Sequence, residues 1–210
     1  MLRHDPRITS ILKIVKNYFS QVRYSTFNLQ TYMPSWHPWE RYSSSYASQK
    51  KYGGGVLFTC CHEIDVAILL FGKVREVFCT ITKSKLNTDV ENSVFLTLKH
   101  EKNIVSNINL DFASQAINKR SFEIIFDKYL IKWNFYKNNI VKYSNNYNKI
   151  FNLKKKSSIE KIYKYQIKSF LNTCNDHRIV SKNFYKNFFE AEKVILAAKK
   201  SILKKKFIKI

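Results

Sequence analysis

The sequence predicts an α+β domain: one large, mostly antiparallel open sheet with helices packed on one of its faces. Three observations predict this class. Short β-like segments joined by short turns fill the middle of the 210-residue chain, and consecutive strands joined in this way pair antiparallel. Helical patterns precede and follow these strands. Hydrophobic residues make up 45% of the chain and aromatic residues 15%, enough for a real core. We therefore treat residues 1–210 as a single domain.

The N-terminal part is expected to contain a helix, a strand and a long loop. Asp5-Pro6 is a good helix start, and apolar residues recur at helical spacing from Ile8 to Val15. We expect a helix over about residues 6–18, within a linking segment 1–20, and a strand over 22–32. Residues 33–55 are rich in Trp, Tyr, Ser, Pro and Gly and have no clean period. Long irregular segments of this kind are often functional, so we expect an ordered loop.

The remaining elements follow from periodicity and turn residues. Residues 56–71 are apolar at helical spacing and end at Gly72, which predicts one continuous helix. Residues 145–158 are polar and Lys-rich and are expected to form a mobile loop. A polar break at 175–177 separates two closing helices in the segment 159–210, and Phe207-Ile208 is expected to add a last strand. The predicted strands are 74–82, 90–99, 104–112, 121–127, 129–135 and 140–143, and the predicted closing helices are 159–172 and 183–203.

The net charge of +22 has two interpretations. One is an electrostatic footprint for nucleic acid or another polyanion. The other is compositional drift, because most of the positive residues are Lys, and Asn, Ile, Tyr and Phe are also abundant. No recognised nucleic-acid-binding motif accompanies the charge, so we expect weak, salt-sensitive binding to polyanions and no specific nucleic-acid partner.

The cysteines and the N-terminus bear on the cellular compartment. The four cysteines include no CxxC pair, so they predict neither a metal site nor a secreted disulfide framework. The first residues lack the apolar region of a signal peptide, and the longest apolar run, residues 66–71, is too short to span a membrane. We expect a cytoplasmic protein without a membrane partner.

The segment GGGVLFTCCHEIDVAILLFG, residues 53–72, carries the chemistry. Three glycines permit unusual backbone angles and close approach to a ligand. Thr59, His62 and Asp65 are spaced three apart, so they share one helix face. A His with a carboxylate one turn later is a candidate general acid/base with an orienting partner. The residues alone leave open that His62 is a hydrogen-bonded structural residue.

The chain resembles the Gfo/Idh/MocA oxidoreductase family, C-terminal domain. Residues 53–77 are similar to the family segment in which a glycine run leads to a helix bearing a His, with an Asp three later. YMPSWHPWERYSSSYASQKKYGGG, residues 32–55, resembles the sugar-nucleotide-linked branch. Residues 2–6 are similar to the Arg-Phe-x-Pro element that opens the first helix, and residues 165–171 and 198–201 are similar to the closing-helix motifs. The likeness runs in order along nearly the whole chain.

This resemblance implies a fold, a reaction and a set of site residues. It implies the substrate-binding half of an NAD- or NADP-dependent oxidoreductase acting on a hydroxyl or keto group of a sugar or sugar nucleotide, in cell-surface polysaccharide biosynthesis. His62 would take part in proton transfer, with Asp65 as its orienting partner, and residues 33–55 would be the substrate-side loop. The sheet would pair subunits in a homo-oligomer. The residues expected to contact substrate are Arg3, Trp36, Arg41, Tyr42, Tyr46 and Thr59.

Two departures from the family pattern keep alternatives open. Thr59 and Phe58 stand where the family has an acidic residue before the His. No GxGxxG follows a strand, and the family's upstream Lys has no counterpart. We therefore expect this chain to be inactive without a Rossmann-domain partner. The alternative hypothesis is a non-catalytic remnant, or a module for sugar binding or oligomerisation. Trp36 and Arg41 equally fit a packing residue and a surface charge.

Overall fold

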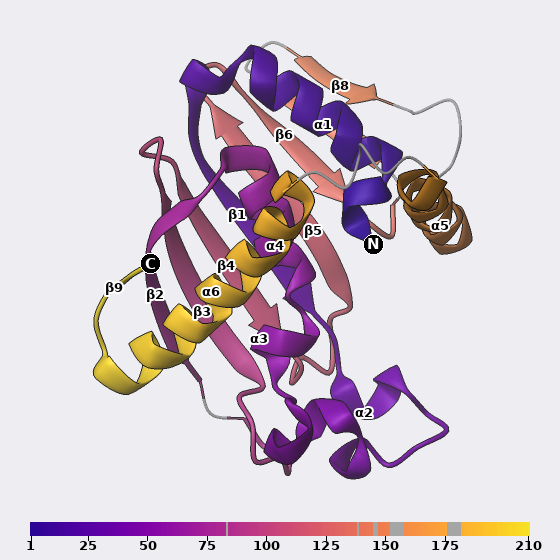
Figure 1. The fold of residues 1–210 in the computed structure, drawn as a ribbon, viewed down its shortest axis with the longest axis vertical. Helices are drawn as coiled ribbons and strands as arrows, with labels where there is room; N and C mark the ends of the chain where they lie inside the picture. Colours follow the sequence, from indigo (N-terminus) through magenta and orange to yellow (C-terminus); the bar gives the residue numbers. More distant parts are fainter. Residues whose placement is uncertain (83, 138, 145–146, 152–157, 176–181) are drawn as a thin grey trace.

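A computed structural model describes residues 1–82, 84–137, 139–144, 147–151, 158–175 and 182–210 of the chain. It confirms the predicted α+β class: a large, mostly antiparallel open sheet with helices on one face (Figure 1). Within the described residues the sheet has nine strands in the order β8-β7-β6-β5-β1-β4-β3-β2-β9. They are β1 (Val22–Gln30), β2 (Val74–Ile81), β3 (Ser93–His100), β4 (Val105–Asp111), β5 (Lys119–Phe126), β6 (Tyr129–Asn134), β7 (Asn139–Ser144), β8 (Tyr147–Phe151) and β9 (Ile208–Lys209).

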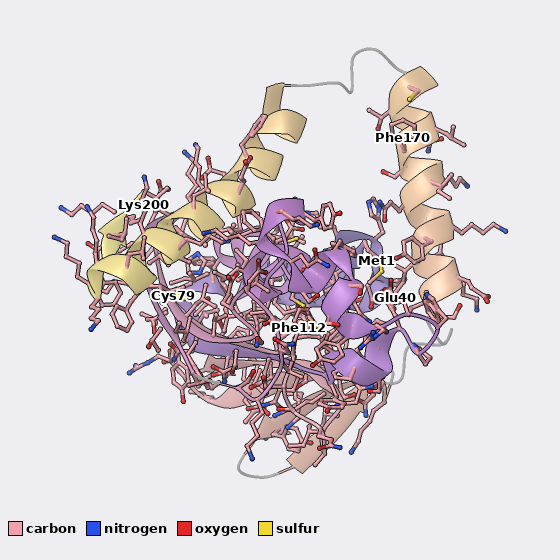
Figure 2. All side chains as sticks on the ribbon, turned by 90° about the horizontal axis from the view of Figure 1, so that it is seen from below. Met1, Glu40, Cys79, Phe112, Phe170 and Lys200 are labelled. Atoms are coloured by element: carbon pink, nitrogen blue, oxygen red, sulfur yellow. The ribbon has the colours of Figure 1, made fainter. Side chains whose placement is uncertain are left out.

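The helices divide into long ones that cover the sheet or extend from it and short turns in the loops. Figure 2 shows the covering helices on one side of the sheet, with the other side open, while α5 extends away from the body. The α-helices are α1 (Pro6–Asn17), α2 (Met33–Trp36), α3 (Val56–Thr59), α4 (His62–Phe71), α5 (Ile159–Asn175) and α6 (Lys182–Lys204). The 3-10 helices are η1 (Leu2–His4), η2 (Phe19–Gln21), η3 (Tyr42–Ser44), η4 (Tyr46–Ser48) and η5 (Lys50–Tyr52).

Strand β1 decides where the loop after it lies. It sits between β5 and β4 and is parallel to β4, the one parallel pair among the described strands. Parallel neighbours end at the same edge of a sheet. The loop that begins after β1 is held at this edge by hydrogen bonds from Thr31 N to Asp111 O and from Met33 N to Phe112 O, both 2.9 Å. Residues 33–55 therefore start at the end of the central strands.

The core lies between the sheet and the helices, and it includes a short polar chain. The inward faces of β1, β3, β4 and β5 are apolar and buried. His100 is fully buried, and its ring lies 2.9 Å from both Gly72 O and Ser106 Oγ. Ser106 in turn accepts from Ser25 Oγ at 2.9 Å. This chain satisfies polar groups that would otherwise be costly to bury.

Two predicted elements differ from the structure. The helix expected over residues 56–71 is broken at Cys60 and Cys61 into α3 and α4. Residues 147–151, expected in a mobile loop, form β8 and pair with β7. The polar composition of that segment predicted a loop, but polar residues can form an edge strand when the neighbouring strand has free backbone groups. The rest of that loop, 145–146 and 152–157, and most of the polar break after Asn175 lie outside the described residues.

The opposite face of the sheet is open and mixed in character (Figure 2). Tyr24 and Phe95 are 47% and 44% exposed, but an Asn28–Asn109 hydrogen bond lies between polar neighbours of the same face. The face therefore combines exposed aromatic rings with polar side chains. Among the described residues no single helix is long and apolar enough to cross a membrane, although the bent pair Lys50–Thr59 and His62–Phe71 passes on length and composition.

Candidate functional site

His62 stands at the first position of α4, directly after the break between α3 and α4. Cys60 departs from helical geometry with φ −108° and ψ 33°, and α4 restarts with Asp65 N donating to Cys61 O at 2.9 Å. The imidazole is half-buried and makes no hydrogen bond or ion pair within the described part of the chain. The structure therefore leaves both ring nitrogens available for a ligand.

Asp65 is held by Arg3, not by His62. Arg3 donates from Nε to Oδ2 at 2.7 Å and from Nη2 to Oδ1 at 2.6 Å. This brings together two residues that the sequence singled out separately, one from η1 and one from α4. It also gives the carboxylate a partner other than the imidazole, because a bidentate guanidinium occupies both of its oxygens.

Sequence reasoning missed a second arginine–carboxylate pair beside His62. Arg120 of β5 donates to Glu63 at 2.7 Å from Nε and at 3.3 Å from Nη2. Its side chain is 13% exposed and that of Glu63 is 4% exposed. The sequence contained one indication of this pair: Arg120 lies on the same face of β5 as the buried residues Phe122 and Ile124. A charge in such a position requires a partner.

These surroundings keep the imidazole of His62 neutral near pH 7. Its pKa lies below the ordinary value of 6.5, first because burial penalises the charged ring and then because the Arg120 cation lies nearby. Glu63 and Asp65 oppose this shift but do not reverse it. A neutral imidazole has one ring nitrogen free to accept a proton, so the site contains a candidate base.

The neighbouring cysteines are not candidate nucleophiles. Burial raises the pKa of the Cys60 thiol well above its ordinary value and also raises that of Cys61. Since the thiolate is the reactive form, both thiols stay protonated and unreactive at neutral pH. All four cysteines are free, and the described residues contain no cluster of His, Cys, Asp and Glu that fits a metal ion.

Thr59 ends α3, one turn before His62. Its hydroxyl Oγ1 is buried and has no hydrogen-bond partner within the described residues. A buried hydroxyl without a partner is costly, and it is available to bond a ligand that enters the site. Thr59 and His62 thus lie on two different helices, so the single helix face expected from their spacing is interrupted.

The three glycines before α3 serve the packing of the chain itself. A Cβ on Gly54 would lie 2.5 Å from Tyr46 O, and a Cβ on Gly55 would lie 2.3 Å from a carboxylate oxygen of Glu91. Gly53 and Gly55 also have positive φ, 73° and 105°, which favours glycine. The expected close approach to a ligand is therefore a close approach of the loop and of Glu91.

Tyr46 is the loop residue that the structure associates with the site. Its side chain is 53% exposed. Its pKa is raised, first by partial burial and then by the nearby Cys60 and by Glu40. Tyr46, in η4, therefore lies near Cys60 and Cys61, the two residues directly before His62.

The other loop residues predicted to contact substrate are Trp36, Tyr42 and Arg41. Trp36 stacks on His37 with ring centroids 4.7 Å apart and packs on buried Phe112 at 5.4 Å. Tyr42 uses its hydroxyl to accept from Asn87 N at 3.3 Å, which ties the loop to residues 84–92. Arg41 is exposed. Within the described residues no hydrogen bond or ring contact joins these three to His62.

A family model decides the relationship of this chain. The model described as GFO/IDH/MocA C-terminal domain matches residues 19–132, more than half of the chain. The chain belongs to the GFO/IDH/MocA family. The match covers β1 to β5, the first part of β6, and all of the site except η1. The resemblance stated from the motifs is thereby confirmed. No curated protein matches the chain.

Solved structures of other proteins share the fold of this GFO/IDH/MocA domain. An oxidoreductase domain protein from Kribbella flavida aligns with TM-score 0.81 and 16% identity, covering 99% of this chain and 64% of that one. Levoglucosan dehydrogenase, in complex with NADH and levoglucosan, aligns with TM-score 0.80 and 15% identity, covering 100% and 65%. Aldose-aldose oxidoreductase from Caulobacter crescentus, complexed with glycerol, aligns with TM-score 0.79 and 12% identity, covering 99% and 62%. This chain thus spans about three fifths of these proteins.

Proposed function

We propose that this domain is the substrate-binding half of an NAD(P)-dependent oxidoreductase that acts on a hydroxyl or keto group of a sugar or sugar nucleotide. The observation that carries the proposal is the half-buried, neutral imidazole of His62, which has no internal hydrogen-bond partner. Solved structures of the same fold include proteins complexed with NADH and levoglucosan and with glycerol. The combination favours a proton-transfer site for a polyol.

In this proposal His62 accepts the proton of the substrate hydroxyl during oxidation and returns it during reduction. A neutral imidazole within hydrogen-bond reach of a hydroxyl is suited to this, since the lowered pKa keeps it unprotonated at pH 7. The Thr59 hydroxyl is available to orient the same ligand. Arg3 uses Nε and Nη2 on Asp65, which leaves Nη1 to donate to an oxygen of the substrate.

The nicotinamide cofactor does not fit the residues of this chain by itself. A dinucleotide site needs a glycine-rich turn whose open space admits the pyrophosphate. The glycine run here is filled by the loop and by Glu91, and α3 has only four residues. When bound by a Rossmann domain, the nicotinamide would supply hydride transfer. We therefore propose that this domain works only together with such a domain, in the same chain or in another.

The surface of α5 supports a partner domain on this side of the molecule. α5 contacts η1, the element that carries Arg3, and Ile162 is its buried anchor. Figure 2 shows α5 extending from the body, with Phe170 on the extended part. Large exposed apolar side chains that gather on one helix mark an interaction surface. Those between 46% and 64% exposed are Ile159, Tyr163, Tyr165, Ile167, Phe170 and Leu171.

Two further parts of the proposal concern substrate class and assembly. The net charge of +22 and exposed Arg41 favour an anionic sugar nucleotide, as used in cell-surface polysaccharide biosynthesis, because basic surfaces attract phosphates. The open sheet face favours a homo-oligomer, since Tyr24 and Phe95 expose large rings on it. A substrate held on Trp36, Arg41 and Tyr46 would lie along the loop 33–55.

The test is binding followed by turnover. Purified chain is titrated calorimetrically with UDP-, GDP-, CMP- and dTDP-linked hexoses and with the free hexoses. The chain is then mixed with NAD(P)-binding proteins that co-purify from its own cells, and NADH absorbance is followed. We expect His62→Ala to abolish turnover and Lys132→Gln, a change in the exposed Lys132–Glu123 pair of the sheet, to leave it unchanged.

The outcomes separate the two functions. Turnover by the His62→Ala complex at the rate of the parent complex contradicts the proposed proton transfer. Sugar binding without turnover with any partner favours the alternative, a sugar-binding module without catalysis. That alternative has one specific observation in its favour: Asp65, the expected orienting partner of His62, is occupied by Arg3.

A further inference from the structure

The orientation of His62 depends on what holds the first turn of α4. The ring itself has no hydrogen-bond partner in the described part of the chain. The helix behind it ends at Thr59, and Cys60 leaves helical geometry, so α4 does not continue an unbroken helix. Contacts from other elements therefore fix the start of α4.

Two arginines do this from two different elements. Glu63, the residue after His62, is held by Arg120 from β5, 57 residues away in sequence. Asp65 is held by Arg3 from η1. The first pair is the more buried, with side-chain exposures of 13% and 4% against 29% and 25% for the second. A buried pair tolerates little displacement, because a shifted carboxylate would leave two unpaired charges in the core.

Arg120 is itself fixed by the sheet. Its strand pairs with β1, where Arg120 lies opposite Leu29, and its carbonyl accepts from Phe135 N at 2.9 Å. Its guanidinium carbon lies 5.5 Å from the centre of the Phe135 ring, within cation–π range. Arg120 thus connects a strand that pairs with β1 to the first turn of α4.

The charged groups that face the imidazole come from three places. Arg120 faces it from β5, Glu63 and Asp65 from its own helix, and the amino group of Met1 from the start of η1. Of these charges Arg120 acts most strongly, in the direction that disfavours a protonated ring. The same guanidinium therefore affects both the place of the imidazole and its proton affinity.

We propose that Arg120 is a positioning residue for His62: through Glu63 it fixes the first turn of α4 and thereby the place and the proton-accepting state of the imidazole. This inference rests on the proposed role of His62 as the proton acceptor. Arg120 does not touch the substrate in this scheme. Its buried pair with Glu63 is the only contact through which it acts on the helix among the described residues.

The test uses the full 210-residue chain and needs no substrate or cofactor. Imidazole nitrogen resonances are followed by NMR against pH in the parent chain, Arg120→Gln and Arg120→Lys, with His62→Gln to assign the His62 signal. Amide hydrogen exchange is measured along α4. Lys132→Gln is the matched control, since Lys132 pairs with Glu123 on the same sheet at 2.6 Å but is exposed.

We expect three results. In Arg120→Gln the pKa of His62 rises, and amide protection in the first turn of α4 falls about tenfold or more, while the last turn is unchanged. In Arg120→Lys the charge remains, so the pKa stays near the parent value, but protection still falls because an ammonium does not bind bidentately. Lys132→Gln changes neither quantity.

Unchanged protection and an unchanged His62 pKa in Arg120→Gln would overturn the inference. Should that variant not fold, Arg120→Gln combined with Glu63→Gln removes the buried charges together and is judged by the same protection criterion. A negative result leaves the proposed reaction standing, because no turnover is measured. An active complex carrying His62→Ala contradicts the reaction and leaves the positioning result intact.

Discussion

Arg7 and Asp5 form a fully buried ion pair at the start of α1. Their side chains are 1% and 0% exposed, with Arg7 Nη2 2.6 Å from Asp5 Oδ2. Arg7 Nη1 also donates to the carbonyls of Asn134 and Phe135, at 3.4 and 3.2 Å. The pair therefore ties the first helix to the end of β6.

Replacing Arg7 by Met leaves the Asp5 carboxylate buried without a cation. Breaking a buried pair in this way costs about 3–5 kcal/mol of folding free energy. The matched control is Lys132→Met. The Lys132–Glu123 pair has the same N···O distance of 2.6 Å, but its side chains are 38% and 36% exposed. An exposed pair contributes less than about 1 kcal/mol, so the loss expected for Lys132→Met is much smaller than that for Arg7→Met.

Urea unfolding followed by far-ultraviolet circular dichroism measures both losses. The Arg7→Met loss should persist at about 0.5 M NaCl, because buried charges are poorly screened. Asp5→Asn keeps a side chain that caps the helix. The double variant Asp5→Asn with Arg7→Met should lose less free energy of unfolding than the two single variants added together, since no unpaired buried charge remains. Equal losses for Arg7→Met and Lys132→Met, or additive single changes, would refute the argument.

Three further outcomes are expected. Burial lowers the pKa of His100, so the contribution of its neutral ring to stability is complete above pH 6.5 and is lost as the pH falls below that value. On acid titration the free energy of unfolding should therefore fall less steeply in His100→Gln than in the parent chain. Equal slopes in the two chains would contradict this. Gly54→Ala should destabilise the fold more than Gly53→Ala, because its Cβ meets Tyr46 O at 2.5 Å while that of Gly53 meets open space; thermal melts that rank them the other way would contradict the packing argument. Phe95→Glu on the open sheet face should convert a homo-oligomer to monomer in light scattering, and an unchanged mass would remove the sheet from the assembly.

Local chemistry predicted much of the fold. The start of α1 at Asp5-Pro6 was predictable because Asp5 caps the helix by accepting from Arg7 N at 2.8 Å and Pro6 suits the first turn. The strands β3 and β4 were predictable because their buried and exposed residues alternate. The insertion of β1 beside β4 in parallel was not predictable, because pairing between distant strands leaves no local pattern.

The site was predictable in its residues and not in its contacts. The spacing of Thr59, His62 and Asp65 indicated a chemical face, and the family match covers that segment. The spacing could not show that Asp65 pairs with Arg3, or that the helix breaks before His62. The Arg3–Asp65 pair joins residues 62 positions apart in the chain.

The sequence by itself determined the fold class, the family and the residue types at the site, because capping, alternation and ordered motifs are properties of neighbouring residues. Only the tertiary structure decided which charged residues form pairs. Arg120 and Glu63 are 57 residues apart in sequence and 2.7 Å apart at their closest atoms. Their pairing follows from the packing of α4 over β1 and β4, because β5, which carries Arg120, is the neighbour of β1.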